Sequence, residues 1–248
     1  MRNKILALQF RINSSTVKQE QVCLEREMSS VVDIEFKNVL TEEIDFSDPK
    51  QLLATYQGVV LGGSGDLDFD GDRPVDDEVR LESLRLVKKL TPLFEYLFVG
   101  DVPTLGICYG HQLLGAFAGA QVCCDPVQKK TKSHQLSRLV SEQECLIFKG
   151  LPEDFDAYYG HKDVLDRVPE GATLLAHGGE ACQISALQYK NNIYTLQFHP
   201  ELTYQDMIER MTGPASYLPE GVAFETLYKK DICSNTILHN FAELVANR

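Results

Sequence analysis

The sequence predicts a doubly wound α/β fold, a mostly parallel central sheet with helices on both faces and an added antiparallel hairpin region. Three observations predict it. Short apolar runs alternate with longer helix-like stretches over residues 5–118, an order typical of parallel sheets. Glycine-rich turns follow two of the apolar runs, at residues 62–65 and 106–110. Beyond residue 122 the apolar runs become shorter and a hairpin turn separates two of them.

The elements of the first half each have a local signal. Ile5–Phe10 is a short apolar run and predicts a buried strand, and Ser14 or Ser15 can cap a helix that continues to about Met28. Pro92 marks a break or kink in a long amphipathic helix. The remaining strands and helices of this half are expected at Val31–Val39, from Pro49 to Tyr56, at Val59–Leu61, Val79–Leu90, Pro103–Ile107 and Gln112–Ala118.

Shorter strands dominate the second half. They are expected at Val122–Cys124, Ser137–Val140, Ala172–Ala176, Ile184–Tyr189 and Ile193–Phe198. Asn191-Asn192 fits a tight hairpin turn between the last two. Ser234 or Asn235 can cap a closing helix that ends near Val245.

Nothing in the sequence marks a domain boundary, and residues 1–248 are expected to form a single domain. Thr212–Val222, rich in proline and glycine, is expected to be irregular. The net charge of −12 argues against nucleic acid or an anionic membrane as a partner. Seven cysteines without a C-x-x-C pair, and no signal peptide or membrane segment, predict a cytoplasmic protein with reduced thiols. No cofactor is expected.

Cys108 occupies a turn between a predicted strand and a predicted helix, with Gly106 and Gly110 two positions to either side. This spacing is typical of a nucleophile elbow, in which glycines let the backbone approach closely around an exposed reactive side chain. The start of the helix carries partial positive charge, which favours the reactive thiolate. A buried cysteine in a tight turn fits the same residues.

His199 and Glu201 close the last predicted strand, which would place them at the sheet edge where doubly wound folds carry their sites. Residues two apart in an extended segment share a face, so the carboxylate can orient the imidazole as the third member of a triad does. A surface histidine beside a glutamate at the start of a helix is the alternative interpretation.

These segments together resemble a known family. Leu105–Gln112 and Gln197–Glu201 are similar to the two signature segments of class I, triad-type glutamine amidotransferases. Leu61–Ser64 resembles the oxyanion loop of that family, although the usual proline is missing. Gly160–Asp163 is similar to a His-Gly-Asp segment of the guanylate synthetase branch, with Lys162 in place of the glycine. The matches follow the order of the family over residues 58–201, as expected for a free-standing glutaminase related to guanylate synthetase.

The resemblance implies a mechanism. Cys108 would attack the side-chain amide of glutamine, with His199 as acid and base and Glu201 orienting it. Backbone N–H groups of Gly63 and Tyr109 would hold the oxyanion. Candidate substrate-binding or pocket residues are Gly62, Tyr109, His111, Gln112, His161 and Asp163.

Two functions from other classes remain open. A free-standing γ-glutamyl peptidase would use the same triad and thioester on γ-glutamyl conjugates, with an amine as the leaving group. A non-catalytic binding protein could retain the fold. If glutamine is the substrate, a separate synthase subunit is the expected partner. A protease and chaperone branch that also uses an elbow cysteine is disfavoured by the histidine late in the sequence.

An acidic loop at Asp66–Asp77 approaches the calcium-loop pattern D-x-D-x-D-G-x5-E. The pattern fails at Asp77, where a bidentate glutamate is needed, and at Arg73, where an aliphatic residue is usual. The sequence therefore favours a solvated acidic loop over a metal site, and no metal is predicted.

Overall fold

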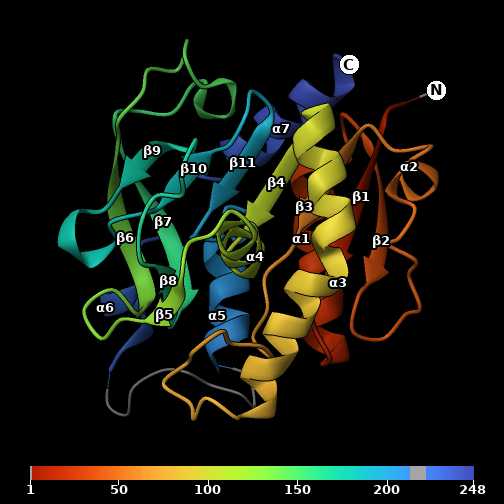
Figure 1. Cartoon of the computed structure of the whole chain (residues 1–248). Coiled ribbons are helices and arrows are strands. Elements are labelled where there is room, and N and C mark those ends of the chain that lie inside the picture. Colours follow the sequence, from red (N-terminus) through yellow and green to blue (C-terminus); the bar gives the residue numbers. More distant parts are fainter. Residues whose placement is uncertain (1, 213–221) are drawn as a thin grey trace.

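The computed structural model describes residues 2–212 and 222–248. Within these residues nine strands form one sheet in the order β2-β1-β3-β4-β11-β10-β9-β6-β7 (Figure 1). The first five are parallel: β1 (Lys4–Gln9), β2 (Asp33–Asn38), β3 (Gly58–Leu61), β4 (Thr104–Ile107) and β11 (Ile193–Leu196). The doubly wound α/β prediction is therefore confirmed.

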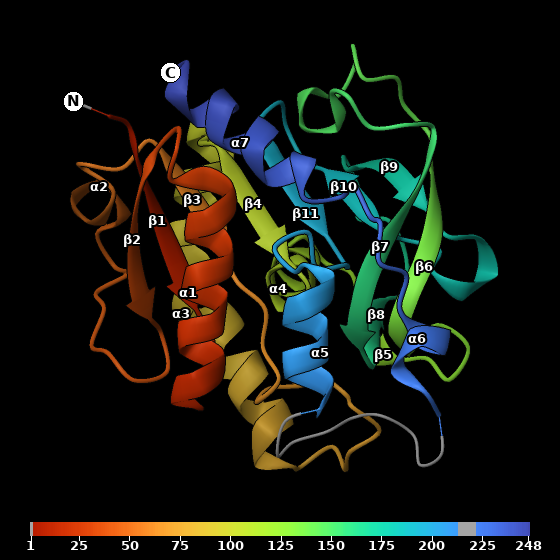
Figure 2. The ribbon, with the colours of Figure 1, turned by 180° about the vertical axis from the view of Figure 1, so that it is seen from behind.

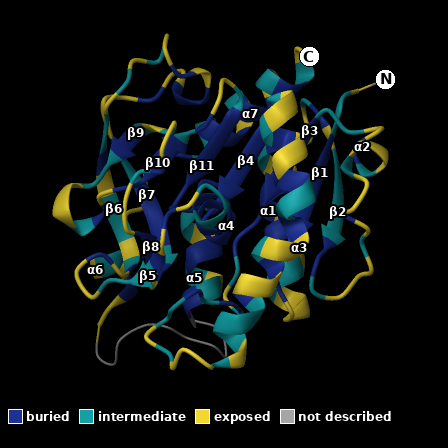
Figure 3. Ribbon diagram, in the orientation of Figure 1, coloured by how far each residue is buried: buried dark blue, intermediate teal, exposed yellow. Residues whose placement is uncertain are grey.

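Helices cover both faces of the parallel strands. On one face lie α3 (Glu78–Gly100) and α4 (Tyr109–Phe117), in front of the sheet in Figure 1. On the other lie α1 (Ser14–Met28) and α7 (Thr236–Ala246), in front in Figure 2. Each face buries its own apolar cluster, and exposed positions gather on the outer surfaces of the helices (Figure 3). Short helix α2 (Pro49–Leu52) contacts α3.

The expected antiparallel region completes the sheet. It consists of β10 (Ala186–Gln188), β9 (Thr173–His177), β6 (Lys130–Arg138) and β7 (Asp154–His161). A separate two-stranded sheet pairs β5 (Val122–Cys124) with β8 (Asp163–Leu165). Strands β7 and β8 were not predicted from the sequence, and the strand of β6 was expected too late, at Ser137–Val140. Polar residues are frequent along β6, whose burial is only partial, so an apolar run does not reveal it.

Helix α3 continues through Pro92, so the break that the sequence allowed at this position does not occur. A proline inside a helix typically costs about 3 kcal/mol through a lost hydrogen bond and a steric clash. The helix buries an apolar stripe on both sides of this position, and that burial outweighs the cost. The stripe consists of Leu86, Leu90, Leu93, Phe94 and Leu97.

Helix ends and turns follow the sequence closely. Asn13, rather than Ser14 or Ser15, caps α1 by accepting hydrogen bonds from the N–H groups of Ser15 and Thr16. Asn235 occupies the N-cap position of α7 but does not cap the helix with its side chain, whose Nδ2 donates to the Pro200 and Leu202 carbonyls instead. The irregular segment expected at Thr212–Val222 lies almost wholly outside the described residues.

The other helical elements are short: 3₁₀ turns at Leu146–Phe148 and Gly179–Ala181, and helices α5 (Tyr204–Thr212) and α6 (Phe224–Leu227). All seven cysteines are free thiols. In the part of the chain that the structure describes, no helix has both the length and the apolar character needed to cross a membrane.

Candidate active site

Cys108 lies between β4 and α4 in a strained backbone conformation, with φ of 51° and ψ of −95°. Non-glycine residues rarely adopt positive φ, and such strain gathers at functional sites. The flanking glycines are required by space. A Cβ atom on Gly106 would lie 2.8 Å from the backbone of Gly110, and one on Gly110 would lie 2.3 Å from the Leu61 carbonyl oxygen. The local geometry is therefore that of a nucleophile elbow.

His199 and Glu201 follow β11, the strand adjacent and parallel to β4. His199 Nδ1 lies 2.7 Å from Glu201 Oε1, and both side chains are buried. The backbone of the segment is held from two sides: His199 N–H donates to the Tyr158 carbonyl at 2.8 Å, and Arg26 Nη2 donates to the Glu201 carbonyl at 2.8 Å. The imidazole therefore has a fixed orientation, with its Nε2 side free to face a reacting group.

The structure brings Cys108 and His199 together, because the adjacent strands β4 and β11 end side by side. The two groups interact electrostatically, since the Cys108 thiol contributes to the raised pKa of His199. A Cβ atom placed on Gly63 would lie 3.1 Å from His199 Cε1 and 3.7 Å from Cys108 Cβ, so the glycine loop borders both. Cys108 Sγ also lies 3.9 Å from the Gly160 carbonyl oxygen and 3.9 Å from Gln197 Nε2.

The charges around the pair favour a protonated imidazole. Burial lowers the pKa of His199, but the Glu201 carboxylate and the Cys108 thiol outweigh burial and raise it to about 9. Burial opposes ionisation of Glu201, yet His199 holds its pKa below the ordinary value. At neutral pH the site therefore favours an imidazolium at His199, balanced by the Glu201 carboxylate.

Gln112 and Asp163, two predicted substrate-binding residues, contact each other and an adjacent loop. Gln112 Nε2 donates to the Asp163 carbonyl at 2.8 Å. The Asp163 carboxylate accepts three backbone N–H groups, those of Phe69, Asp70 and Gly71, at 2.9, 2.8 and 2.7 Å. Burial nevertheless raises the pKa of Asp163. In this structure Asp163 anchors the acidic loop and does not point an open oxygen toward a substrate.

His161 remains available for a ligand. Its Nε2 lies 3.1 Å from the Gln128 carbonyl oxygen, and its Nδ1 is buried with no hydrogen-bond partner among the described residues. Burial lowers the pKa of His161 to about 3, so the ring is neutral. The neighbouring residue, Gly160, contacts Cys108. A neutral, unsatisfied ring nitrogen in this position suits a polar substrate atom.

Tyr109 and His111 do not form pocket walls, contrary to the expectation from the sequence. The Tyr109 ring packs between Phe10 and Phe69, and its hydroxyl donates to Ser83 Oγ at 2.9 Å. His111 is fully buried, and burial lowers its pKa to about 3. The side chains of Tyr109 and His111 lie in the core, because the first turn of α4 is enclosed by β3, β4 and β11. The backbone N–H of Tyr109 still lies at the start of α4, where N–H groups lack an acceptor within the helix.

The N–H of Gly63, the other predicted oxyanion donor, does not face Cys108 in this structure. It donates to Glu20 Oε1 at 3.1 Å. Glu20 also forms a buried ion pair with Arg11, whose Nε lies 3.1 Å from the same oxygen. Neither Glu20 nor Arg11 was predicted from the sequence. One feature of the sequence could have indicated Arg11 as a site residue. It lies two positions after the first buried strand, at the edge of the sheet where functional sites are common in such folds.

Basic side chains pair with two carboxylates of the acidic loop, those of Asp68 and Asp70. Asp68 contacts Arg73 at 2.9 Å and Lys162 at 3.1 Å, and Asp70 contacts Arg80 at 3.1 Å. Within residues 2–212 and 222–248, no group of three or more His, Cys, Asp or Glu side chains is arranged to hold a metal ion. Lys162, which replaces the glycine of the related segment, directly follows β7 and forms an ion pair with Asp68 of this loop.

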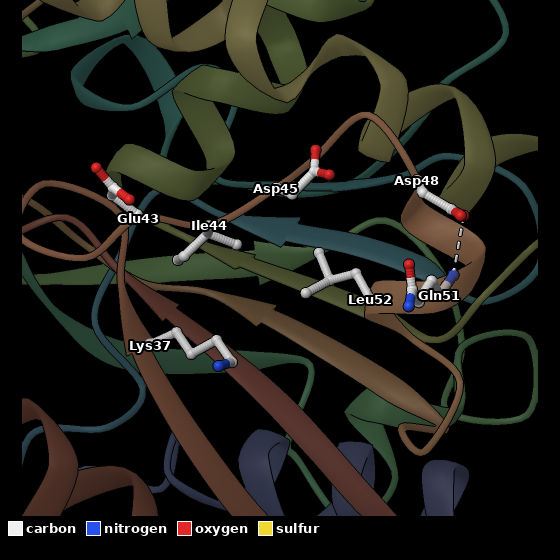
Figure 4. A pocket seen from close by; sticks show the side chains of 7 residues that line it. All are labelled: Lys37, Glu43, Ile44, Asp45, Asp48, Gln51 and Leu52. Atoms are coloured by element: carbon white, nitrogen blue, oxygen red, sulfur yellow. Dashed lines mark hydrogen bonds between the residues drawn. The ribbon is translucent and has the colours of Figure 1, made fainter.

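The elbow is closed to solvent in this structure. Cys108 is 3% exposed and His199 is 4% exposed. An open pocket of about 200 Å³ lies elsewhere, beside β2 and α2 (Figure 4). It is lined by Lys37, Glu43, Ile44, Asp45, Asp48, Gln51 and Leu52, none of them a predicted site residue. By contrast, the side chains of Cys108 and His199 are almost fully buried in this structure.

The described chain thus combines a mostly parallel sheet with a cysteine elbow that lies near a buried His–Glu pair. A family model described as glutamine amidotransferase class I matches residues 34–212, a span that includes Gly63, Cys108, His199 and Glu201. The chain belongs to this family.

Relatives and solved structures agree with the family. The chain is 37% identical over 121 residues to a glutamine-hydrolyzing GMP synthase subunit of Methanocaldococcus jannaschii, covering 48% of the chain and 62% of that protein. It is 30% identical over 165 residues to the corresponding GMP synthase subunit of Archaeoglobus fulgidus, covering 66% and 76%. The match to the first of these relatives thus spans less than two thirds of its length. A glutamine amidotransferase structure from Thermotoga maritima matches with a TM-score of 0.66, 19% identity and complete coverage of both chains, a likeness of fold.

Proposed function

We propose that this protein is a glutaminase of the amidotransferase type, which releases ammonia from the glutamine side chain through a γ-glutamyl thioester on Cys108. The observation that carries the proposal is the meeting of Cys108, His199 and Glu201 at the ends of two adjacent parallel strands. Membership of the family and the names of the two GMP synthase relatives support glutamine as the substrate.

In the proposed first step the Cys108 sulfur attacks the amide carbon of glutamine, and the carbonyl oxygen takes up the negative charge. The carbon–nitrogen bond then breaks as the His199 imidazolium donates its proton to the departing ammonia. The raised pKa of His199, about 9, supports this role because the ring holds its proton at neutral pH. Glu201 balances the charge of the imidazolium.

In the second step a water molecule attacks the thioester, and His199 accepts a proton from that water. The carbon–sulfur bond breaks, glutamate is released, and the Cys108 thiolate is regenerated on the protein. We propose that the Tyr109 N–H stabilises the oxyanion in both steps. His161, with its free Nδ1, is the proposed contact for a polar group of the substrate.

The test measures ammonia release from glutamine by the wild-type protein and by a Cys108→Ala variant. The matched control is Cys123→Ala, which removes a thiol on β5 outside the site. Loss of ammonia release in Cys108→Ala alone supports the proposal, and a retained rate contradicts it. γ-Glutamyl peptides are assayed in parallel, since faster release of their amines would identify a γ-glutamyl peptidase with the same triad.

We also propose that the ammonia passes to a separate synthase subunit. The relatives named as glutamine-hydrolyzing GMP synthase subunits support this. The test supplies the protein with a synthase subunit, together with the nucleotide substrates of that synthase. Stimulated glutamine hydrolysis coupled to amination supports the partner, and an unchanged rate contradicts it.

A further inference from the structure

The peptide between Gly62 and Gly63 has a defined orientation. Its carbonyl accepts a hydrogen bond from the Gly110 N–H at 3.1 Å, at the start of α4. Its N–H donates to Glu20 Oε1 at 3.1 Å. A trans peptide directs its C=O and N–H to opposite sides, and the described chain has no cis peptide. The N–H of Gly63 therefore points away from the helix start beside Cys108.

Glu20 is firmly held where it accepts this N–H. It is 1% exposed, on the inner side of α1. Arg11 Nε donates to Oε1 at 3.1 Å, and Gln9 Nε2 donates to Oε2 at 2.9 Å. A Cβ atom on Gly62 would lie 2.9 Å from Oε1, so the carboxylate packs directly against the glycine loop. A buried carboxylate with three donors does not leave its position readily.

We propose that Glu20 is a positioning residue that withholds the Gly63 N–H from the reacting carbonyl and thereby limits the basal rate of the enzyme. The proposal rests on the proposed function, because it concerns the oxyanion formed on Cys108. Rotation of the peptide would supply the N–H to the oxyanion. The same rotation would turn the Gly62 carbonyl oxygen toward the Glu20 carboxylate, where two negative oxygens repel each other.

The negative charge of Glu20 thus stabilises, in two ways, the peptide orientation in which the Gly63 N–H is turned away from Cys108. It accepts the N–H in that orientation, and it opposes the carbonyl in the other. Removal of the charge should shift the loop toward the orientation that serves catalysis. A purely structural role for Glu20 predicts the opposite, since loss of a buried ion pair would disturb the site and slow the reaction.

The experiment compares two alkylating reagents on Cys108 in the wild type and in Glu20→Gln. With iodoacetamide, sulfur displaces iodide in one step and no oxyanion forms. With a chloroketone analogue of glutamine, sulfur can first add to the ketone and place negative charge on its oxygen. Sulfur then bonds to the adjacent carbon as chloride leaves, the first carbon–sulfur bond breaks, and the ketone re-forms. The ratio of the two rates therefore reports oxyanion stabilisation separately from thiolate reactivity.

Glu20→Gln should raise the chloroketone-to-iodoacetamide ratio about 10-fold, less than the roughly 100- to 1000-fold contribution of a complete oxyanion donor. The rate of ammonia release should rise in the same direction. The matched control is Glu35→Gln, which removes one partner of the exposed Lys4–Glu35 pair and should leave the ratio unchanged.

An unchanged or lower ratio in folded Glu20→Gln overturns the inference. If that variant does not fold, Gln9→Met provides the second test. It removes one donor to Glu20 but keeps the ion pair with Arg11, and a smaller rise in the ratio is expected. No rise in Gln9→Met would then overturn the inference. If neither reagent labels Cys108 in the wild type, the proposed function fails instead.

Discussion

Glu201 and Asp163 are both buried carboxylates near the elbow, but they accept hydrogen bonds from different kinds of donor. Glu201 faces one imidazole, that of His199, two residues away in the sequence. Asp163 faces three backbone N–H groups of a loop more than ninety residues away. Glu201 orients the His199 imidazole, whereas Asp163 holds the backbone of the acidic loop in place. The two should therefore respond differently to substitution.

The largest effect is expected from Glu201→Gln, which keeps the shape of the side chain but removes its charge. The imidazolium of His199 loses its partner, so its pKa should fall from about 9 toward the ordinary value. Glutamine hydrolysis should fall about 10,000-fold, the loss found when the carboxylate of a serine-protease triad is replaced by its amide. Steady-state kinetics between pH 6 and 10 give both quantities.

The matched control is Glu209→Gln, an exposed carboxylate on α5. It should leave the rate and its pH dependence unchanged. A Glu201→Gln variant with nearly the wild-type rate would show that the carboxylate does not support His199, and the contrast with Asp163 would disappear.

Asp163→Ala should act on stability first. Three backbone donors lose their acceptor, and a fall of about 2–3 kcal/mol in the free energy of unfolding is expected. Urea unfolding measures this loss, and hydrogen exchange should show faster exchange at residues 69–71. The control is Asp45→Ala, an exposed carboxylate that accepts hydrogen bonds from Ser47. Equal losses in the two variants would contradict the anchoring role.

Two histidines of the site differ in the sign of their pH dependence. The pKa of His199 is raised from 6.5 to about 9, so its contribution to stability is present below pH 6.5 and is lost as the pH rises to 9. The pKa of His161 is lowered from 6.5 to about 3, so its contribution is present above pH 6.5 and is lost as the pH falls to 3.

Each histidine should make the free energy of unfolding depend on pH, with a slope of up to about 1.4 kcal/mol per pH unit. Substitution by asparagine should remove this slope, on the alkaline side for His199 and on the acid side for His161. Urea unfolding at a series of pH values measures both. If the pH dependence of the free energy of unfolding does not change, or changes at the opposite end of the pH range, the environments assigned to the two histidines are contradicted.

The same contrast explains how much could be predicted from the sequence. The elbow at Cys108 and the His199–Glu201 pair are local patterns, and the alternation of elements predicts the parallel sheet that carries them. The adjacency of β4 and β11, which brings them together, comes from the structure. Glu20 and Asp163 act on backbone groups far away in the sequence, and a carboxylate that accepts N–H groups leaves no local signal. The local cost of Pro92 predicts a break, but the apolar burial along the whole of α3 keeps the helix continuous.

The most direct measurement of the central claim is mass spectrometry of the protein quenched in acid during turnover of glutamine. The proposed mechanism predicts a γ-glutamyl group on Cys108 and on no other cysteine. The adduct should accumulate in His199→Asn if slow thioester hydrolysis outlasts its formation. Turnover without a Cys108 adduct, together with an active Cys108→Ala variant, would contradict the mechanism.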